Sequence, residues 1–176
     1  GIEKAGIHPL LTSEIEPNAR KTILLNRPNI GLIGDINNYS ASEIRKFANI
    51  SENQEIDLVI GGPPCQAYSL VGRAVKEDNM DGDERNYLYK QYCKFLKRYQ
   101  PKMFVFENVP GLLTAKNGKH FANLKKYLAH VGYKLDYREL NAKNFGVLQN
   151  RRRIIIIGWK AEYDGEYFYP QFEDVP

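Results

Sequence analysis

The residues of this chain best suited to chemistry lie where short apolar runs end. Cys65 stands in the segment Gly62-Pro-Pro-Cys-Gln-Ala-Tyr-Ser69, which directly follows the apolar run 57–61. The glycines and prolines before Cys65 favour a sharp, rigid exit from that run, which a cysteine that only fills a core does not need. A thiol presented in this way is a candidate nucleophile. Cys93 lies among aromatic residues instead, and we interpret it as a core residue.

Two further sets of charged residues adjoin apolar runs. Glu107 follows the run 103–106. A carboxylate at that place is costly unless it is paired or functional, although it could also cap the following turn. The arginines 151–153 lead into the run 153–157. Successive arginines usually form a solvated or phosphate-facing turn, but before a buried strand at least one could point into a pocket.

The apolar runs predict the strands that position these groups. The runs 57–61, 103–106 and 153–157 are short, rich in β-branched or aromatic residues, and bounded by Gly, Pro or polar residues, as buried strands are. A weaker strand is predicted at 30–36, and an alternating, half-exposed one at 133–140.

Apolar residues at helical spacing separate several of these strands. This spacing predicts a helix over 85–99, before Pro101, and another over 121–131, before Gly132. A third helix is expected to start at Pro17, because proline suits the first helical position. Strands that alternate with helices predict an α/β fold with a mainly parallel sheet and helices on both faces.

The predicted fold gives the candidate residues a common location. Ligands of such sheets bind at the carboxyl ends of the strands. Because Cys65 and Glu107 follow two of the predicted strands, we expect the thiol and the carboxylate to face one pocket at that edge.

Composition limits the class of protein. The 176 residues suit one compact domain, and 43% hydrophobic and 26% charged residues are ordinary for a globular protein. No apolar run approaches the roughly 20 residues that a membrane span needs, and no signal-peptide pattern opens the chain. Two cysteines predict neither a disulfide framework nor a zinc site, so we expect no metal. An intracellular location is expected, cytoplasmic in a bacterium or nuclear in a eukaryote.

Charge is unevenly distributed although the net charge is only +4. Between residues 116 and 153, ten Lys and Arg residues stand against two acids. Such a segment can bind phosphate groups, as in nucleic-acid-binding proteins. It can also be a solvated helix face, and on charge alone we favour that interpretation.

In their order and context these segments resemble the cytosine-5 DNA methyltransferases across essentially the whole chain. Each motif by itself is weak, but three in register with matching strand contexts are specific. The matching segments are Pro64-Cys65-Gln66 for the nucleophile motif, Glu107-Asn108-Val109 for the Glu-Asn-Val motif, Gln149-x-Arg151-x-Arg153 for the Gln-x-Arg-x-Arg motif, Asp83-x-Arg85-x-x-Leu88 between them, and Gly34-Asp35-Ile36 with Glu14 on the cofactor side.

The resemblance implies a Rossmann-like S-adenosylmethionine-dependent methyltransferase fold and methylation of carbon 5 of a flipped-out cytosine in DNA. Cys65 would attack carbon 6, which makes carbon 5 nucleophilic. Glu107 would hydrogen-bond or protonate ring nitrogen 3. Arg153 would hold the exocyclic oxygen of the base, and Arg151 would support the loop or a phosphate.

The resemblance also implies a set of cofactor residues. Glu14 would bind the ribose hydroxyls of S-adenosylmethionine, Ile15 would pack on the adenine, and Asp35 would bind the adenine amino group. The remaining positions implied to line this pocket are Ile36, Pro64 and Leu88.

The chain departs from the family pattern at both ends. The chain opens at Gly1-Ile-Glu-Lys-Ala-Gly6, which resembles the helix just after the family's Gly-rich Phe-x-Gly-x-Gly turn, and the turn itself is absent. The chain stops at Pro176 without the target-recognition domain and the last two family motifs. Leu148 stands where the family usually has Pro. We therefore expect residues 1–176 to be a catalytic domain that is incomplete at both ends.

Three functions remain open at this point. The first is a DNA methyltransferase whose partners are double-stranded DNA and, for a split enzyme, a complementing chain with the target-recognition domain. The second is an RNA cytosine-5 methyltransferase, since one branch of the family has the same catalytic motifs. The third is a non-catalytic nucleic-acid-binding module or subunit. No membrane partner is expected.

Overall fold

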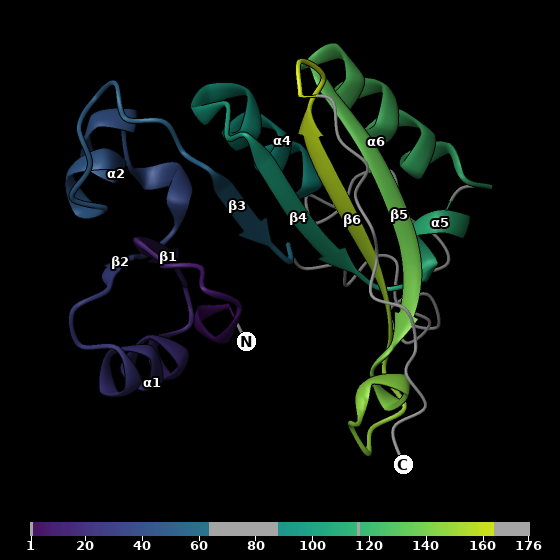
Figure 1. The fold of residues 1–176 in the computed structure, drawn as a ribbon, viewed down its shortest axis with the longest axis horizontal. Helices are drawn as coiled ribbons and strands as arrows, with labels where there is room; N and C mark the ends of the chain where they lie inside the picture. The colour runs from purple at the N-terminus through teal and green to yellow at the C-terminus, as the bar shows by residue number, and fades with distance from the viewer. Residues whose placement is uncertain (1, 64–87, 116, 164–176) are drawn as a thin grey trace, which may run out of the picture. The chain divides into compact units, whose positions relative to one another are not determined.

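The computed structural model describes residues 2–63, 88–115 and 117–163. These residues form two compact units, 1–55 and 56–176, each with its own sheet. Figure 1 shows the elements of both units with their labels.

Unit 1 (residues 1–55) contains two short parallel strands, β1 (Leu11–Ser13) and β2 (Gly31–Ile33). Helix α1 (Pro17–Asn26) connects them and begins at Pro17, as predicted. The N-cap is Glu16, whose side chain accepts a hydrogen bond from the backbone N–H of Asn18.

The predicted strand at 30–36 is shorter in the structure. It ends at Ile33, because the Asp35 side chain accepts a hydrogen bond from Asn37 N and starts the turn η2 (Ile36–Asn38). Helix α2 (Ala41–Phe47) follows, with a capping box between Ser40 and Glu43. The turn η1 (Glu3–Ala5) precedes β1.

Unit 2 (residues 56–176) contains a four-stranded sheet in the order β3-β4-β6-β5. Its strands are β3 (Leu58–Gly61), β4 (Met103–Asn108), β5 (Tyr133–Asn141) and β6 (Arg152–Lys160). The three runs predicted as buried strands are therefore neighbours in one sheet, with β3 at its edge.

Strand direction differs in part from the prediction. β3 and β4 are parallel, but β6 is antiparallel to both β4 and β5. The connection from β5 to β6 explains this difference: it contains only the residues 142–151, with the turn η5 (Ala142–Phe145). A parallel connection needs a crossover of a dozen or more residues, so a short loop joins antiparallel neighbours.

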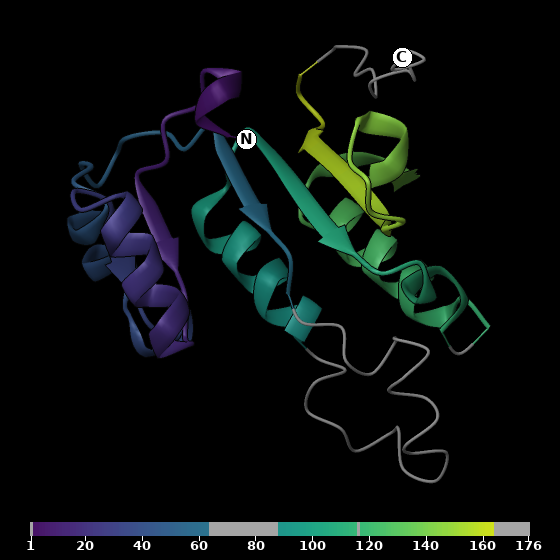
Figure 2. The same cartoon turned by 90° about the horizontal axis from the view of Figure 1, so that it is seen from below.

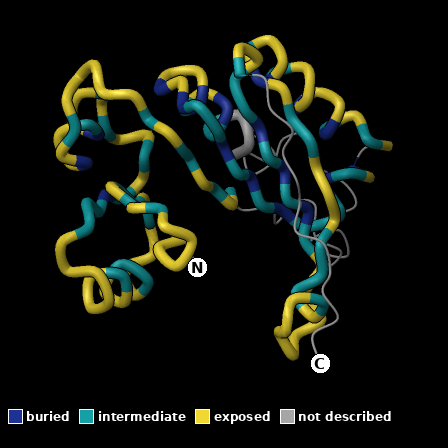
Figure 3. Tube along the Cα trace, in the orientation of Figure 1, coloured by how far each residue is buried: buried dark blue, intermediate teal, exposed yellow. Residues whose placement is uncertain are grey.

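The helices of unit 2 pack against one face of its sheet. They are α4 (Leu88–Tyr99), α5 (Gly111–Thr114) and α6 (Lys119–His130), the last followed by Gly132 at positive φ. Their apolar side chains form one core with Phe104 and Phe106 of β4 and Ile154 and Ile156 of β6. Figure 2 shows these elements from a second direction, and Figure 3 shows buried positions alternating along β4 and β6.

The described helices are short. None of them is both long and apolar enough to cross a membrane.

Candidate active site

The carboxyl end of β4 carries two adjacent polar residues on opposite faces of the sheet. Strand β4 is longer than predicted and includes Glu107 and Asn108. Phe104, Phe106 and Asn108 are buried on the face that packs against the helices, in the period-2 pattern of a strand. Glu107 therefore points to the other face, where it does not cap the following turn.

Strand β6 places arginines beside Glu107. Because β6 is antiparallel to β4, its start lies next to the end of β4, with Ile155 opposite Glu107. Arg153 Nε lies 2.7 Å from Glu107 Oε1, and Arg151 Nη2 lies 3.9 Å from the same oxygen. The structure thus brings together three of the predicted catalytic residues.

Arg152 points to the other face of the sheet. Its Nε binds the carboxylate of Glu139 on β5, and this contact raises the pKa of Arg152 above its ordinary value. Successive side chains of a strand point to opposite faces of the sheet. Arg153 and Arg151, which stands just before β6, therefore lie on the face of Glu107, and Arg152 lies on the opposite face.

The group formed by Glu107, Arg151 and Arg153 is only partly shielded from solvent. The side chain of Glu107 is 37% exposed, that of Arg153 25% and that of Arg151 49%. A charge-assisted hydrogen bond at 2.7 Å orients the Glu107 carboxylate and the Arg153 guanidinium. Such a pair can recognise a planar ligand that offers a ring N–H to the carboxylate and a carbonyl oxygen to the guanidinium.

The end of β3 also reaches this group. A Cβ at Gly62 would lie 3.1 Å from Glu107 Oε2, so the backbone there approaches the carboxylate closely. Asn108 Nδ2 donates to the carbonyl oxygen of Pro63 at 3.4 Å. The segment that continues to Pro64 and Cys65 starts from this place. Pro64 and Cys65 themselves lie outside the described residues, so their predicted positions are not tested.

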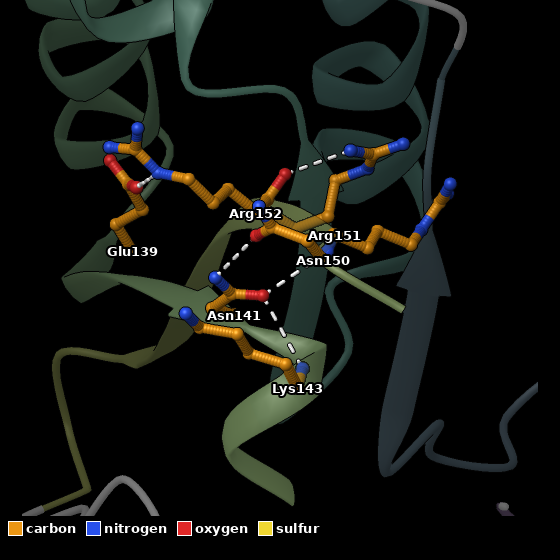
Figure 4. A network of polar contacts seen from close by, with 7 residues as sticks. Glu139, Asn141, Lys143, Asn150, Arg151 and Arg152 are labelled. Carbon is orange, nitrogen blue, oxygen red and sulfur yellow. Dashed lines mark hydrogen bonds and ion pairs between the residues drawn. The ribbon is translucent and has the colours of Figure 1, made fainter. Parts of the chain in front are cut away.

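A polar network holds the loop that carries Arg151 (Figure 4). Asn141 Oδ1 accepts from the backbone N–H groups of Arg151 at 3.1 Å and Lys143 at 3.3 Å. Asn141 Nδ2 donates to Asn150 Oδ1 at 2.8 Å. One side chain at the end of β5 thus closes the loop just before β6 and orients its first residues.

The candidate cofactor residues of unit 1 follow two parallel strands. Glu14 comes directly after β1, and Asp35 lies two residues after β2. Glu14 Oε1 accepts from Glu16 N at 2.8 Å, and the Glu14 carbonyl accepts from Arg20 Nη1 at 3.0 Å. The Glu14 carboxylate and backbone are therefore held at the carboxyl edge of the strand pair, where ligands of parallel sheets bind.

The hydrogen-bond acceptors at this edge suit the hydroxyl and amino groups of a nucleoside. Carboxylates such as Glu14 and Asp35 can accept hydrogen bonds from hydroxyl or amino groups. Ile15 directly follows Glu14 in the sequence. Its side chain is largely exposed and offers an apolar surface to a ring. Ile36 is the first residue of η2. Leu88 is the first residue of α4, in unit 2, and its side chain is not described.

Cys93 is a core residue, in agreement with the sequence interpretation. It is 1% exposed in the core of unit 2, and burial raises the pKa of its thiol to about 12. A thiolate is the reactive form of cysteine, so this side chain is not suited to nucleophilic attack.

Sequence reasoning used Gly62 only for the sharp exit from its strand and named Asn108 only as part of the Glu-Asn-Val motif. A signal for Asn108 was present, because Phe104, Phe106 and Asn108 share one face by period 2, and a polar residue on an otherwise apolar face needs a partner. Nothing in the sequence identified Pro63 as that partner, since β3 and β4 are more than 40 residues apart.

Known DNA methylases match the chain over most of its length. The family model of C-5 cytosine-specific DNA methylases matches residues 1–174. The chain is 38% identical to the type II methyltransferase M1.HphI of Haemophilus parahaemolyticus over 97% of its own length and 44% of the relative's. It is 34% identical to M.NgoPII of Neisseria gonorrhoeae over 97% of its length and 47% of the relative's. The chain thus spans less than half of these relatives.

Solved structures show the same fold. A prophage-encoded protein of E. coli, described as a DNA modification methyltransferase, matches with a TM-score of 0.72 and 27% identity, over 90% of this chain and 42% of that one. The Dnmt2 methyltransferase of S. pombe matches with a TM-score of 0.68 and 20% identity, over 93% and 46%. The fold is therefore the α/β fold of S-adenosylmethionine-dependent methyltransferases. Taken with the Glu107–Arg153 pair and the family match over nearly every residue, this places the chain in the family of C-5 cytosine-specific DNA methylases.

Proposed function

We propose that this chain is the catalytic part of an enzyme that transfers a methyl group from S-adenosylmethionine to carbon 5 of a cytosine flipped out of a DNA duplex. The observation that carries the proposal is the ion pair between Glu107 and Arg153 at 2.7 Å. Glu107 lies beside Gly62, and its neighbour Asn108 contacts Pro63, where the segment with Cys65 begins.

Cys65 is the proposed nucleophile. Its thiolate adds to carbon 6 of the cytosine, and the electrons of the 5,6 double bond make carbon 5 nucleophilic. Once carbon 5 carries the methyl group, it loses its proton to a base or water, and the electrons of that C–H bond re-form the 5,6 double bond as the bond from carbon 6 to sulfur breaks. Cys65 is thereby regenerated without any net oxidation or reduction.

Glu107 and Arg153 are the proposed binding groups for the base. Glu107 hydrogen-bonds or protonates ring nitrogen 3, which withdraws electrons from the ring as the thiolate adds. The Arg153 guanidinium already binds Glu107 through Nε and the Arg152 carbonyl through Nη1 at 2.8 Å. A guanidinium has five N–H donors, so further donors are available for the exocyclic oxygen. Arg151, whose guanidinium is half-exposed, is proposed to support the loop or bind a phosphate.

Unit 1 is proposed to supply most of the residues that bind the cofactor. S-adenosylmethionine supplies the methyl group as an electrophile attached to a sulfonium. Glu14 accepts the ribose hydroxyls, Asp35 accepts the adenine amino group, and Ile15 packs against the ring. Ile36, Pro64 and Leu88 are proposed to complete the pocket. The carboxylate acceptors after β1 and β2 and the exposed side chain of Ile15 support this assignment.

Trapping with 5-fluorocytosine tests the proposed reaction. Fluorine cannot leave carbon 5 as a cation, so the final elimination is blocked and the covalent adduct persists. We expect the full-length protein to become attached through Cys65 to a duplex that carries 5-fluorocytosine at the target, in the presence of S-adenosylmethionine. Peptide mapping by mass spectrometry identifies the attached residue.

Two cysteine variants control this experiment. Cys65→Ser should form no adduct, because a hydroxyl is far harder to ionise than a thiol. Cys93→Ser should form the adduct, because Cys93 is buried away from the site. Attachment at Cys93, or trapping by Cys65→Ser, would overturn the mechanism. Trapping on RNA but not on the DNA duplex would show an RNA substrate instead.

A further inference from the structure

We propose that Asn108 is a positioning residue for this reaction, which ties the start of the Cys65 segment to the strand that carries Glu107. The inference rests on the proposed function, because it concerns the placement of the proposed nucleophile. The residues that carry it are Gly62, Pro63, Glu107 and Asn108, all within unit 2.

The first argument is the burial of an amide where an apolar side chain would be expected. Asn108 is 4% exposed, and Phe104 and Phe106 occupy the same face of β4. Among the described residues, Asn108 is the single buried residue with a polar side chain other than tyrosine. Because a buried amide without partners is unfavourable, its presence indicates that its hydrogen bonds are used.

Both ends of the Asn108 amide have partners. Oδ1 accepts from the backbone N–H of Val109 at 2.8 Å, which orients the side chain. Nδ2 then donates to the carbonyl of Pro63 at 3.4 Å, at the upper limit of hydrogen-bond length. The Val109 contact is local, whereas the Pro63 contact joins two strands that are far apart in the sequence. The second contact is the one that fixes the exit from β3.

Gly62 provides an independent second contact between the same two segments. A Cβ at Gly62 would stand 3.1 Å from Glu107 Oε2 and 3.8 Å from the Glu107 carbonyl oxygen. The exit from β3 thus packs against the Glu107 carboxylate at a distance that suits glycine. Asn108 holds the exit on one side of β4, and Glu107 adjoins it on the other.

This arrangement couples the positions of two proposed reacting groups. Cys65 follows Pro63 by two residues, and Glu107 precedes Asn108 by one. A thiolate must approach carbon 6 while a carboxylate approaches nitrogen 3 of the same ring. A misplacement of about 1 Å can slow such a reaction on the order of 100-fold. The Asn108–Pro63 hydrogen bond therefore serves the rate of attack on the base.

The test separates the rate of attack from the amount of folded protein. In the full-length protein, Asn108→Ser keeps a short polar group for Val109 N–H but cannot reach Pro63. We expect it to form the 5-fluorocytosine adduct on the order of 10-fold or more slowly than wild type, with the same final amount per folded protein. Asn108→Ala removes both hydrogen bonds and should be at least as slow. Ile156→Val, a change in the same core away from Pro63, is the matched control.

Each outcome decides one point. If Asn108→Ser and Asn108→Ala lower the melting temperature as Ile156→Val does and trap at the wild-type rate, Asn108 is only structural and the inference is wrong. Should both Asn108 variants fail to fold, the rate for Asn108→Asp decides, because aspartate keeps the acceptor for Val109 N–H but has no N–H donor for the Pro63 carbonyl. An unchanged rate there also overturns the inference. If wild type itself forms no adduct, the proposed function fails, and the inference fails with it.

Discussion

At the scale of single residues, neighbours in sequence have different tasks because a strand alternates its faces. Arg152 and Arg153 have the same side chain and adjacent positions, but one binds Glu139 and the other binds Glu107. Glu107 and Asn108 divide in the same way between the proposed base-binding face and the core. A substitution of Arg152 is therefore a control for one of Arg153.

Arg153→Lys should slow methyl transfer far more than Arg152→Lys. Lysine keeps the charge but lacks the planar, multiply donating guanidinium that can bind Glu107 and a carbonyl oxygen together. We expect Arg153→Lys to lower the single-turnover rate roughly 10- to 100-fold, as the loss of a charged hydrogen bond of about 1.5–3 kcal/mol implies. Arg152→Lys should stay within about 2-fold of wild type, since exposed ion pairs contribute little. Equal losses in the two variants would contradict the proposed role of Arg153.

Cys93 should be protected from alkylation in the folded protein. Burial raises the pKa of its thiol to about 12, so at pH 8 the thiolate is scarce and inaccessible. Iodoacetamide at pH 8 should leave Cys93 unmodified in the folded chain and modify it after urea unfolding. Rapid modification of Cys93 without denaturant would show that the core of unit 2 opens readily.

The same pKa predicts a dependence of stability on pH. The folded pKa of Cys93 lies above its unfolded value of roughly 9, so the unfolded state releases the proton first as pH rises. The contribution of Cys93 to stability is therefore complete below about pH 9 and is lost between there and pH 12. Urea unfolding of wild type and Cys93→Ala at pH 7.5 and pH 10.5 measures it. We expect the difference between the two proteins to shrink at the higher pH.

At the scale of elements, the packing of β6 against β4 places Arg153 beside Glu107. Gly158 on β6 lies opposite Phe104 on β4, and a Cβ at Gly158 would stand 2.1 Å from the Phe104 ring. Phe104 is fully buried in the core with the helices. The absence of a side chain at Gly158 is therefore what admits the ring.

Gly158→Ala should destabilise the protein substantially. Overpacking of this kind typically costs about 1–3 kcal/mol, and the contact here is with a buried ring, so we expect at least about 2 kcal/mol by urea unfolding. Phe104→Leu should lose stability by itself but relieve the contact. The double variant should then be less destabilised than the sum of the single ones. Additive losses would show that the ring and the glycine are not in conflict.

At the scale of the whole molecule, the proposed chemistry is divided between the two units. Glu14, Ile15, Asp35 and Ile36 belong to unit 1, whereas Glu107, Arg151 and Arg153 belong to unit 2. Each set lies at strand ends of its own sheet. The division predicts that cofactor binding and attack on the base respond to different substitutions.

Glu14→Ala in the full-length protein should weaken S-adenosylmethionine binding roughly 10-fold or more, because a carboxylate that accepts hydroxyl hydrogen bonds is removed. Glu107→Gln should leave that affinity within about 3-fold and slow adduct formation instead, since an amide cannot deliver a proton to ring nitrogen 3. Isothermal calorimetry and the trapping assay measure the two effects. A Glu107→Gln protein that loses cofactor binding as strongly as Glu14→Ala would contradict the division.

The sequence by itself determined the family, the strands of unit 2 and most of the candidate residues, but not the strand β1 of unit 1. Apolar runs with β-branched residues and apolar residues at helical spacing are local patterns, so the strands of unit 2 and the helices at Pro17 and 119–130 could be predicted from them. The ends of strands were harder to predict where a side chain binds the backbone. The Asp35 side chain does so and starts the turn η2, so β2 ends before the predicted position.

Only the tertiary structure decided which side chains meet. The direction of β6 and its register with β4 determine that Arg153, and not Arg152, binds Glu107. They depend on pairing between segments more than 40 residues apart, and a shift by one residue would exchange the faces. The contact between Asn108 and Pro63 depends in the same way on the pairing of β3 with β4. Local patterns specify that a strand forms, but the packing of the whole sheet selects its neighbours.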